Sequence, residues 1–122
     1  MASTLVEDKA KACVDAAAEC VQACEACASR CCIPGTDPAM AGCAKLCLDC
    51  AAICALCVTL LARGSGWSEQ VCRLCAEICD ACAAECERFE ADGCRRCAEA
   101  CRRCAEACRA RVALSEEPPT AR

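Results

Sequence analysis

Residues 47–57 read CLDCAAICALC, and this stretch decides how the chain folds. Its four cysteines, Cys47, Cys50, Cys54 and Cys57, follow one another at steps of three, four and three residues. Residues at these steps lie on one face of an α-helix, with neighbouring Cβ atoms about 5–6 Å apart. A bundle helix normally has leucine at such positions. The stretch therefore predicts a helix whose buried face is a row of thiols.

Three groups of turn-forming residues separate this helix from others like it. They are IPGTDP at 33–38, RGSGWS at 63–68 and EADG at 90–93. Gly64 is expected to end a helix, and Pro38 suits the first position of one. The expected N-terminal caps are Asp37, Ser65 or Ser68, and Asp92. The segments between these turns contain no proline and are rich in alanine, glutamate and arginine, as long helices require.

The same row of cysteines recurs in each of the four segments. Twenty of the 21 cysteines fit the alternating step of three and four residues, with Ala17 at one skipped position and Cys32 one step off the row. The rows are Cys13, Cys20, Cys24, Cys27 and Cys31; Cys43, Cys47, Cys50, Cys54 and Cys57; Cys72, Cys75, Cys79, Cys82 and Cys86; and Cys94, Cys97, Cys101, Cys104 and Cys108.

Short links between long helices favour antiparallel neighbours. We therefore predict an all-α fold, an up-down-up-down four-helix bundle with a cysteine-lined core, formed by residues 1–114. The expected helices span 5–32, 38–63, 67–90 and 93–113. Residues 115–122 contain two prolines and no apolar period, so we expect a disordered tail.

Composition narrows the possible functions. The net charge of −4 and the absence of histidine and tyrosine favour neither a nucleic-acid binder nor a histidine-based catalytic site. Arginines gather on the last segment, where we expect an exposed or subunit-facing surface: Arg95, Arg96, Arg102, Arg103, Arg109 and Arg111. We expect no signal peptide, no membrane span and a cytoplasmic location, where thiols remain reduced.

Twenty thiols in register are poorly explained as ordinary core residues, because a cysteine buries far less apolar surface than a leucine. Disulfides within a helix are disfavoured, because the Cβ separation at steps of three or four exceeds the roughly 3.5–4.5 Å that a disulfide needs. Metal binding remains as the explanation for the rows of thiols. Di-iron bundles need histidine, ferredoxin clusters need a CxxCxxC run, and the chain has neither.

The net charge of the metal with its thiolate ligands distinguishes the two remaining candidates, zinc and Cu(I). Zinc on four thiolates is chemically reasonable but leaves two negative charges in a dry core. Cu(I) prefers thiolate and thioether ligands, and one copper per thiolate leaves no net charge. The rows therefore predict several Cu(I) ions per chain, bound and bridged by all 21 cysteines.

The two ends of the bundle are expected to differ. One end gathers the apolar residues Val6, Leu61, Trp67 and Val112. The other gathers Cys31, Cys32, Met40, Cys86, Phe89 and Cys94. We expect copper to enter at this sulfur-rich end, with Cys32 and Met40 as early, weaker ligands; Met40 as an ordinary gap-filling core residue is the alternative.

Segments such as CRLCAEICDACAAEC (72–86) and CRRCAEACRRCAEAC (94–108) resemble those of the bacterial copper storage proteins. The resemblance covers residues 13–108 and is closer to the cytosolic branch. It implies Cu(I) chelation by CxxxC pairs and assembly as a homo-tetramer. The implied pairs are Cys20 with Cys24, Cys43 with Cys47, Cys50 with Cys54, Cys75 with Cys79, Cys82 with Cys86, Cys97 with Cys101, and Cys104 with Cys108. Histidines, common near the open end in that family, are absent here.

The function predicted is high-capacity cytosolic Cu(I) storage or buffering, without catalysis. Copper would come from a copper chaperone or a small-molecule donor. Two other classes stay open: metallothionein-like sequestration of zinc or mixed metals, and a metal-responsive sensor.

Overall fold

Residues 2–32 and 37–116 are described by the computed structural model of the chain, and every element among them is helical. Helix α1 spans Ala2–Ala26 and continues into a π-helical turn, η1, at Cys27–Cys31. Helices α2, α3 and α4 span Met40–Ala62, Ser68–Cys86 and Asp92–Glu116. These bounds differ from the expected ones by a few residues. Residues 115–116 belong to α4, so the expected disordered tail is wrong there, and residues 117–122 lie outside the described part.

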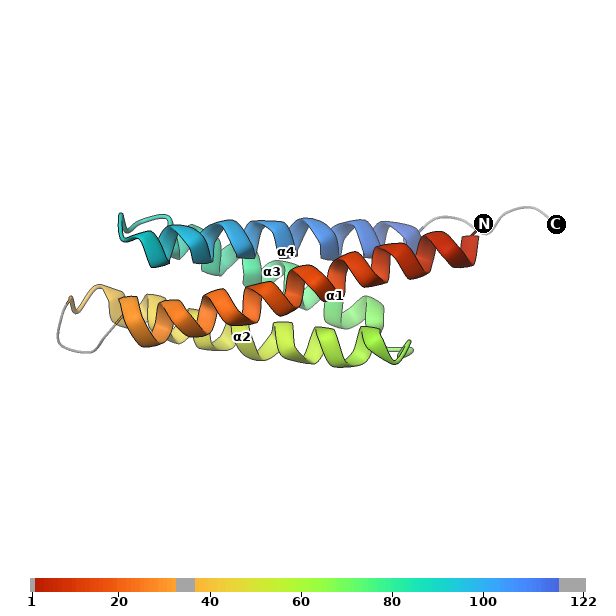
Figure 1. Ribbon diagram of the computed structural model, residues 1–122, viewed down its shortest axis with the longest axis horizontal. Helices are drawn as coiled ribbons and strands as arrows, with labels where there is room; N and C mark the ends of the chain where they lie inside the picture. The colour runs from red at the N-terminus through yellow and green to blue at the C-terminus, as the bar shows by residue number, and fades with distance from the viewer. Residues whose placement is uncertain (1, 33–36, 117–122) are drawn as a thin grey trace.

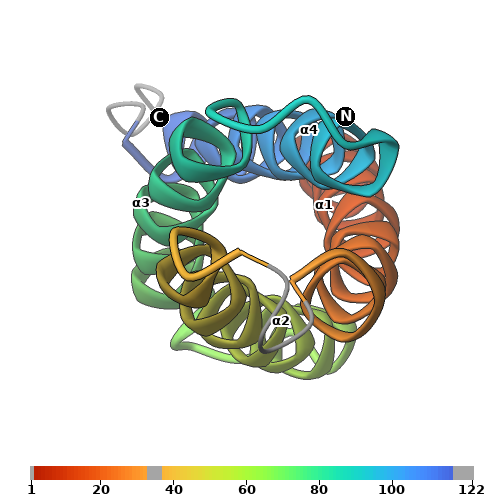
Figure 2. The same ribbon diagram turned by 90° about the vertical axis from the view of Figure 1, so that its left-hand side faces the viewer.

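The four helices form the predicted up-down-up-down bundle. Each helix packs against the two that are its neighbours in the ring order α1, α2, α3, α4, and α4 closes the ring against α1. The view along the bundle shows the helices surrounding one central axis (Figures 1 and 2). The diagonal helix pairs have no close backbone approach within the described ranges. Side chains that point to the axis therefore meet those of all the other helices.

Local sequence explains where the helices end. Gly64 has φ of 66°, its N–H donates to Leu61 O at 3.1 Å, and Ser65 N–H donates to Leu60 O at 3.0 Å. These two bonds form a Schellman motif, which confirms Gly64 as the stop of α2. Asp37 Oδ1 accepts from Ala39 N–H at 3.0 Å and so caps the turn that leads into α2, whose own N-cap residue is Ala39.

The start of α3 differs from expectation in one respect. Its N-cap residue is Trp67, which makes no side-chain cap. Ser65 instead caps the preceding turn, where its Oγ accepts from Trp67 N–H at 3.0 Å. Ser68 is buried as the first residue of α3, and its hydroxyl donates to Ser65 O at 2.7 Å. The two serines therefore stabilise the turn that connects α2 to α3.

Helix α2 corrects the expectation that no segment is apolar enough to span a membrane. By length and composition alone, α2 is the one described helix that could do so. Core helices of soluble proteins share these two properties. Much of its apolar character comes from cysteines that face the bundle axis, and leucines such as Leu48 and Leu56 lie exposed on the opposite side.

Ion pairs join the outer surfaces of neighbouring helices. Arg102 of α4 reaches Glu87 at 2.8 Å and Asp80 of α3 at 3.3 Å, and Arg103 of α4 pairs with Glu19 of α1. These ion pairs lie at the surface, where water screens the charges and such pairs contribute little to stability. The bundle is held mainly by its interior, which consists almost wholly of cysteine and alanine.

Candidate metal centre

The interior of the bundle is a continuous column of thiols. All 21 cysteines are unpaired by disulfides, and 20 of them are buried. The α-helical period places a cysteine on the axis at nearly every turn, and the four-helix ring brings four rows together. The column therefore brings together the thiols that the sequence pattern predicts as ligands, and Cys31 is the one thiol that is only half-buried.

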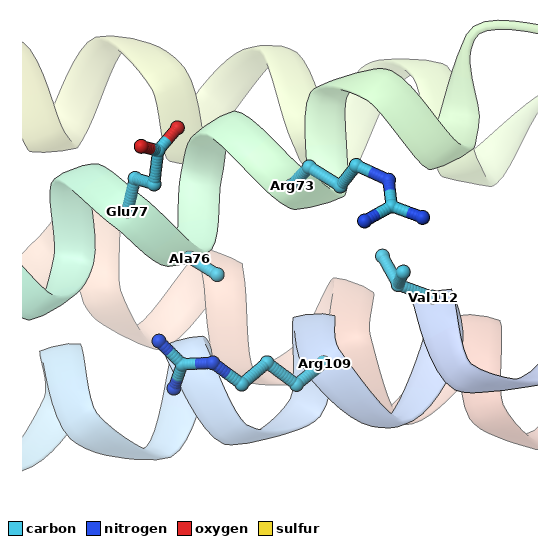
Figure 3. Close-up of a pocket in the computed structure, with 5 residues that line it drawn as sticks. All are labelled: Arg73, Ala76, Glu77, Arg109 and Val112. Carbon is cyan, nitrogen blue, oxygen red and sulfur yellow. The ribbon is translucent and has the colours of Figure 1, made fainter.

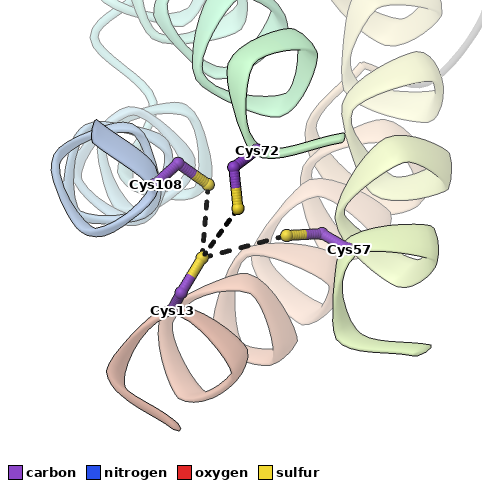
Figure 4. A group of neighbouring side chains, drawn as sticks. All are labelled: Cys13, Cys57, Cys72 and Cys108. Carbon is purple, nitrogen blue, oxygen red and sulfur yellow. Dashed lines mark hydrogen bonds between the residues drawn. The ribbon is translucent and has the colours of Figure 1, made fainter. Parts of the chain in front are cut away.

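Four thiols meet at the end of the column near the α2–α3 link. Cys13 Sγ lies 3.8 Å from Cys57 Sγ, 3.9 Å from Cys72 Sγ and 3.4 Å from Cys108 Sγ. Figure 4 shows that each of the four helices supplies one of these thiols and that all four thiols point to a common centre. A metal–sulfur bond of about 2.3 Å gives sulfur separations of about 3.8 Å in tetrahedral and 4.0 Å in trigonal geometry. The thiols thus stand at metal-binding separations without backbone movement.

The middle of the column is a denser network. Cys54 Sγ lies 4.0 Å from Cys50 Sγ, 3.7 Å from Cys75 Sγ and Cys79 Sγ, and 3.8 Å from Cys104 Sγ. A thiolate here can share ions with thiols of α3 and α4 and with the preceding turn of α2. Further four-thiol groups of this kind include Cys20, Cys24, Cys50 and Cys101, and Cys24, Cys82, Cys97 and Cys101.

The network continues toward the sulfur-rich end. Cys47 Sγ lies 3.7 Å from Cys86 Sγ and 3.8 Å from both Cys82 Sγ and Cys97 Sγ, and Cys43 Sγ lies 3.5 Å from Cys86 Sγ. An ion could therefore move along the column by exchanging one sulfur ligand at a time.

The CxxxC pairs implied by the family resemblance are only partly direct contacts. Four have sulfur separations of 3.8 to 4.0 Å: Cys20 with Cys24, Cys50 with Cys54, Cys75 with Cys79, and Cys97 with Cys101. By contrast, Cys43 and Cys47 meet through Cys86 of another helix. Contacts between helices are therefore as important to the arrangement as those within one helix.

The end of α1 corrects the predicted row. Cys31 was expected on the row and Cys32 one step off it. The π-turn shifts the register by one residue, with Cys32 N–H donating to Cys27 O at 2.9 Å. Cys32 is consequently buried, with its Sγ 3.9 Å from Cys27 Sγ, and Cys31 is half-buried. Cys94 Sγ completes this end at 3.8 Å from Cys27 Sγ.

The apolar end is closed by a different set of residues from the one expected. Leu61 and Val112 are buried as predicted, together with Val71, which the sequence reasoning missed. Trp67 is 67% exposed and Val6 is 38% exposed, so neither closes the bundle. Met40, at the sulfur-rich end, is half-buried and packs against the core at the start of α2.

Protonation of the thiols depends on burial and on their neighbours. Burial raises the pKa of Cys32 to about 11 and also raises the pKa of Cys43 and Cys94. A hydrogen bond from the Cys101 thiol lowers the pKa of Cys97 to about 6. Thiolate and not thiol is the metal ligand, so metal binding to these buried thiols must release protons.

The charge of the interior discriminates between metals. Ser68 is the only buried residue, among those described, with a polar or charged side chain apart from the thiols. No buried arginine or lysine within these ranges could neutralise zinc tetrathiolate centres. A monovalent ion paired with each thiolate leaves the column neutral, which favours Cu(I).

A surface groove of about 480 Å³ between α3 and α4 does not belong to this site. Arg73, Ala76, Glu77, Arg109 and Val112 line it, and none of them is a thiol (Figure 3). Arg73 pairs with Glu69 at 3.0 Å, and Arg109 pairs with Asp80. The groove is therefore part of the paired outer surface, separate from the thiol column.

Fold and site together define a four-helix bundle that binds many soft metal ions in its core. A sequence model of the copper storage protein family matches residues 6–113. The chain belongs to this family, which is one of storage proteins and not of enzymes. No curated protein sequence matches it.

Solved structures that are similar to this chain are also copper storage proteins. A cytosolic copper storage protein from Streptomyces lividans, loaded with five coppers, is 34% identical, with a TM-score of 0.85, 90% of this chain covered and 97% of that chain. The Cu(I)-bound copper storage protein BsCsp3 is 38% identical, with a TM-score of 0.81 and coverage of 85% and 98%. The apo copper storage protein 3 from Bacillus subtilis is 39% identical, with a TM-score of 0.77 and coverage of 84% and 97%.

Proposed function

We propose that the chain is a non-catalytic, high-capacity store and buffer of Cu(I) in the cytosol. The observation that carries the proposal is the column of 20 buried thiols, with sulfur separations of 3.4 to 4.0 Å and no buried cation among the described residues. Structures of copper storage protein from Streptomyces lividans support it, since one is described as cytosolic and another as loaded with 10 copper equivalents. All 21 cysteines are proposed ligands, and Met40 is proposed as an early ligand.

Anaerobic titration of the reduced apoprotein with Cu(I), against a competing chromogenic chelator, tests the proposal. Two thiols per copper, unshared, give about ten ions, and shared thiolates allow more, whereas four thiols per zinc give about five ions. We expect ten or more tightly bound coppers. Saturation at one or two ions would refute storage and would indicate that the thiols have a sensing or structural role.

Two matched variants of α2 locate the bound ions. Cys54→Ala removes a sulfur with four close sulfur neighbours, and we expect capacity to fall by about one or two ions. Ala55→Ser alters the next residue, which is exposed, and should leave capacity unchanged. Equal capacities for the two variants would place the copper outside the column.

We further propose that the chain assembles as a homo-oligomer, a tetramer by analogy with the family. The outer faces of α2 and α3 support this assembly, because Leu48, Leu56 and Leu74 are each about half exposed. Leu46 and Ile78 extend the same surface around a groove between the two helices. Large exposed apolar surface of this kind marks interfaces. Sedimentation of Leu56→Glu should show a smaller species than the unmodified protein, with copper capacity per chain unchanged.

Delivery of copper by a chaperone or a small molecule is also proposed.

A further inference from the structure

A groove between α1 and α4 reaches the one thiol of the chain that is not fully buried. The groove has a volume of about 590 Å³, within the range of small-molecule sites. Cys31 and Gly93 line one part of it, and Arg30, Arg96 and Arg103 line others. Because the other 20 thiols are buried, Cys31 is the thiol at which an ion from outside can first bind sulfur.

Cys31 is held at this position by the start of α4. A Cβ at position 93 would lie only 1.9 Å from Cys31 Sγ, so the backbone of Gly93 lies directly against that sulfur. Cys27 begins the π-helical turn η1 that Cys31 ends, and its sulfur belongs to the buried column. From Cys27 the path continues to Cys32 at 3.9 Å and Cys94 at 3.8 Å. Cys31 therefore joins the groove to the thiol column.

The charges of the groove favour an anion. Three arginines and two glutamates, Glu19 and Glu99, line it, and Arg103 pairs with Glu19 across α1 and α4. Arg30 and Arg96 are exposed and have no carboxylate partner within ion-pair distance among the described residues. Guanidinium groups bind carboxylates with paired, charge-assisted hydrogen bonds.

We propose that this groove binds a small carboxylate-bearing thiol that carries Cu(I), and that Cys31 takes the ion from it. This inference rests on the proposed storage function. A reduced donor must hold Cu(I) through sulfur, because soft thiolates are its preferred ligands. The carboxylates would bind Arg30 and Arg96, which places the donor's copper beside Cys31 Sγ.

The transfer is a ligand exchange without oxidation or reduction. The donor holds Cu(I) between two thiolates, RS–Cu–SR, with one negative charge on this core. Cys31 Sγ binds the copper, one Cu–SR bond breaks, and the departing RS⁻ takes the proton that Cys31 gives up. The products are a mixed complex, Cys31–S–Cu–SR, and one free thiol, RSH. A second exchange with the thiol of Cys27 then releases the remaining donor thiol and moves copper into the column.

The test compares two donors across three proteins, and Cys31→Ala is a fourth protein that tests the role of this thiol. The donors are preformed Cu(I) complexes of glutathione, which bears carboxylates, and of 2-mercaptoethanol, which bears none. The proteins are the unmodified chain, Arg30→Ala/Arg96→Ala, and Lys45→Ala/Arg63→Ala, which removes the same charge from exposed positions of the α2 region. Stopped-flow luminescence of the Cu(I)–thiolate clusters gives the loading rate, and titration gives the final capacity.

With the glutathione complex, we expect the groove variant to load about tenfold more slowly at low salt, with the difference shrinking as salt rises. With the mercaptoethanol complex, all three proteins should load at one rate. Cys31→Ala should slow loading from both donors and lower capacity by at most one ion. Equal rates for the groove variant and the unmodified chain, or equal slowing with both donors, would overturn the proposal. A low final capacity in the unmodified chain would instead refute storage itself.

Discussion

The substitution Gly93→Ala tests the contact that holds Cys31 in place. The added Cβ would lie 1.9 Å from Cys31 Sγ but 3.5 Å from Cys31 Cβ. The second distance is an ordinary contact and the first is not, so the Cys31 side chain must turn about χ1 while the backbone stays. Gly93 has no positive φ, and alanine therefore fits its backbone conformation.

The expected energies follow from this geometry. Alanine in place of a helical glycine stabilises by roughly 0.5–1 kcal/mol, and displacing Cys31 from its rotamer costs about 0.5–1.5 kcal/mol. Gly93→Ala alone should therefore change the free energy of unfolding very little. In a Cys31→Ala background, where the clashing sulfur is gone, the same change should stabilise by roughly 0.5–1 kcal/mol.

Anaerobic urea unfolding of the four reduced apoproteins measures this double-mutant cycle. Alkylation by a bulky maleimide, followed by mass spectrometry, reports separately on Cys31, since the other 20 thiols are buried. We expect the first alkylation to be faster in Gly93→Ala, because the sulfur has turned outward. Additivity within about 0.3–0.5 kcal/mol together with an unchanged alkylation rate would refute the contact. A destabilisation above about 3 kcal/mol would show that the backbone moves instead.

Four further predictions concern protons and sulfur ligands. Copper retention should weaken as pH falls, because protons compete for the thiolates; chelator competition between pH 8 and 5 measures this, and a flat profile would contradict it. Burial raises the pKa of Cys32 from 9.0 to about 11. The contribution of the neutral Cys32 thiol to apoprotein stability is therefore complete below about pH 9 and is lost as pH rises toward 11. Urea unfolding would detect this loss, and Cys32→Ala should reduce it. Met40→Leu should slow copper loading at constant capacity, and an unchanged rate would remove Met40 from the pathway. Ala17, fully buried at the skipped position of its row, should accept Cys and bind about one more copper, and titration showing no gain would contradict the continuous column.

Much of the site could be predicted because helical period and ligand chemistry are both local. The steps of three and four residues from Cys47 to Cys57 place their sulfurs on one helix face in any fold that keeps the helix. Gly64 likewise ends α2 through its own conformational freedom. Residue type and spacing were therefore enough to predict the bundle, its thiol interior and the choice of Cu(I).

Other features depend on how the helices meet. Cys31 and Cys32 differ by one residue, and only the π-turn, formed where α1 packs against α2 and α4, decides which of them enters the column. Trp67 was expected among the apolar residues at one end of the bundle, yet its place at the α2–α3 link leaves it exposed. Val71, one turn later in the chain, is buried instead.

The helices, their rows of thiols and their preference for Cu(I) can be read from the residues alone, because these features follow from local period and from the chemistry of sulfur. The approach of particular sulfurs depends on the packing of the four helices, since the contacts of Cys13 with Cys57, Cys72 and Cys108 join residues far apart in the chain. That packing has one more consequence. It also brought Cys31 to a groove lined by Arg30, Arg96 and Arg103, because α1 and α4 become neighbours only when the ring of four helices closes.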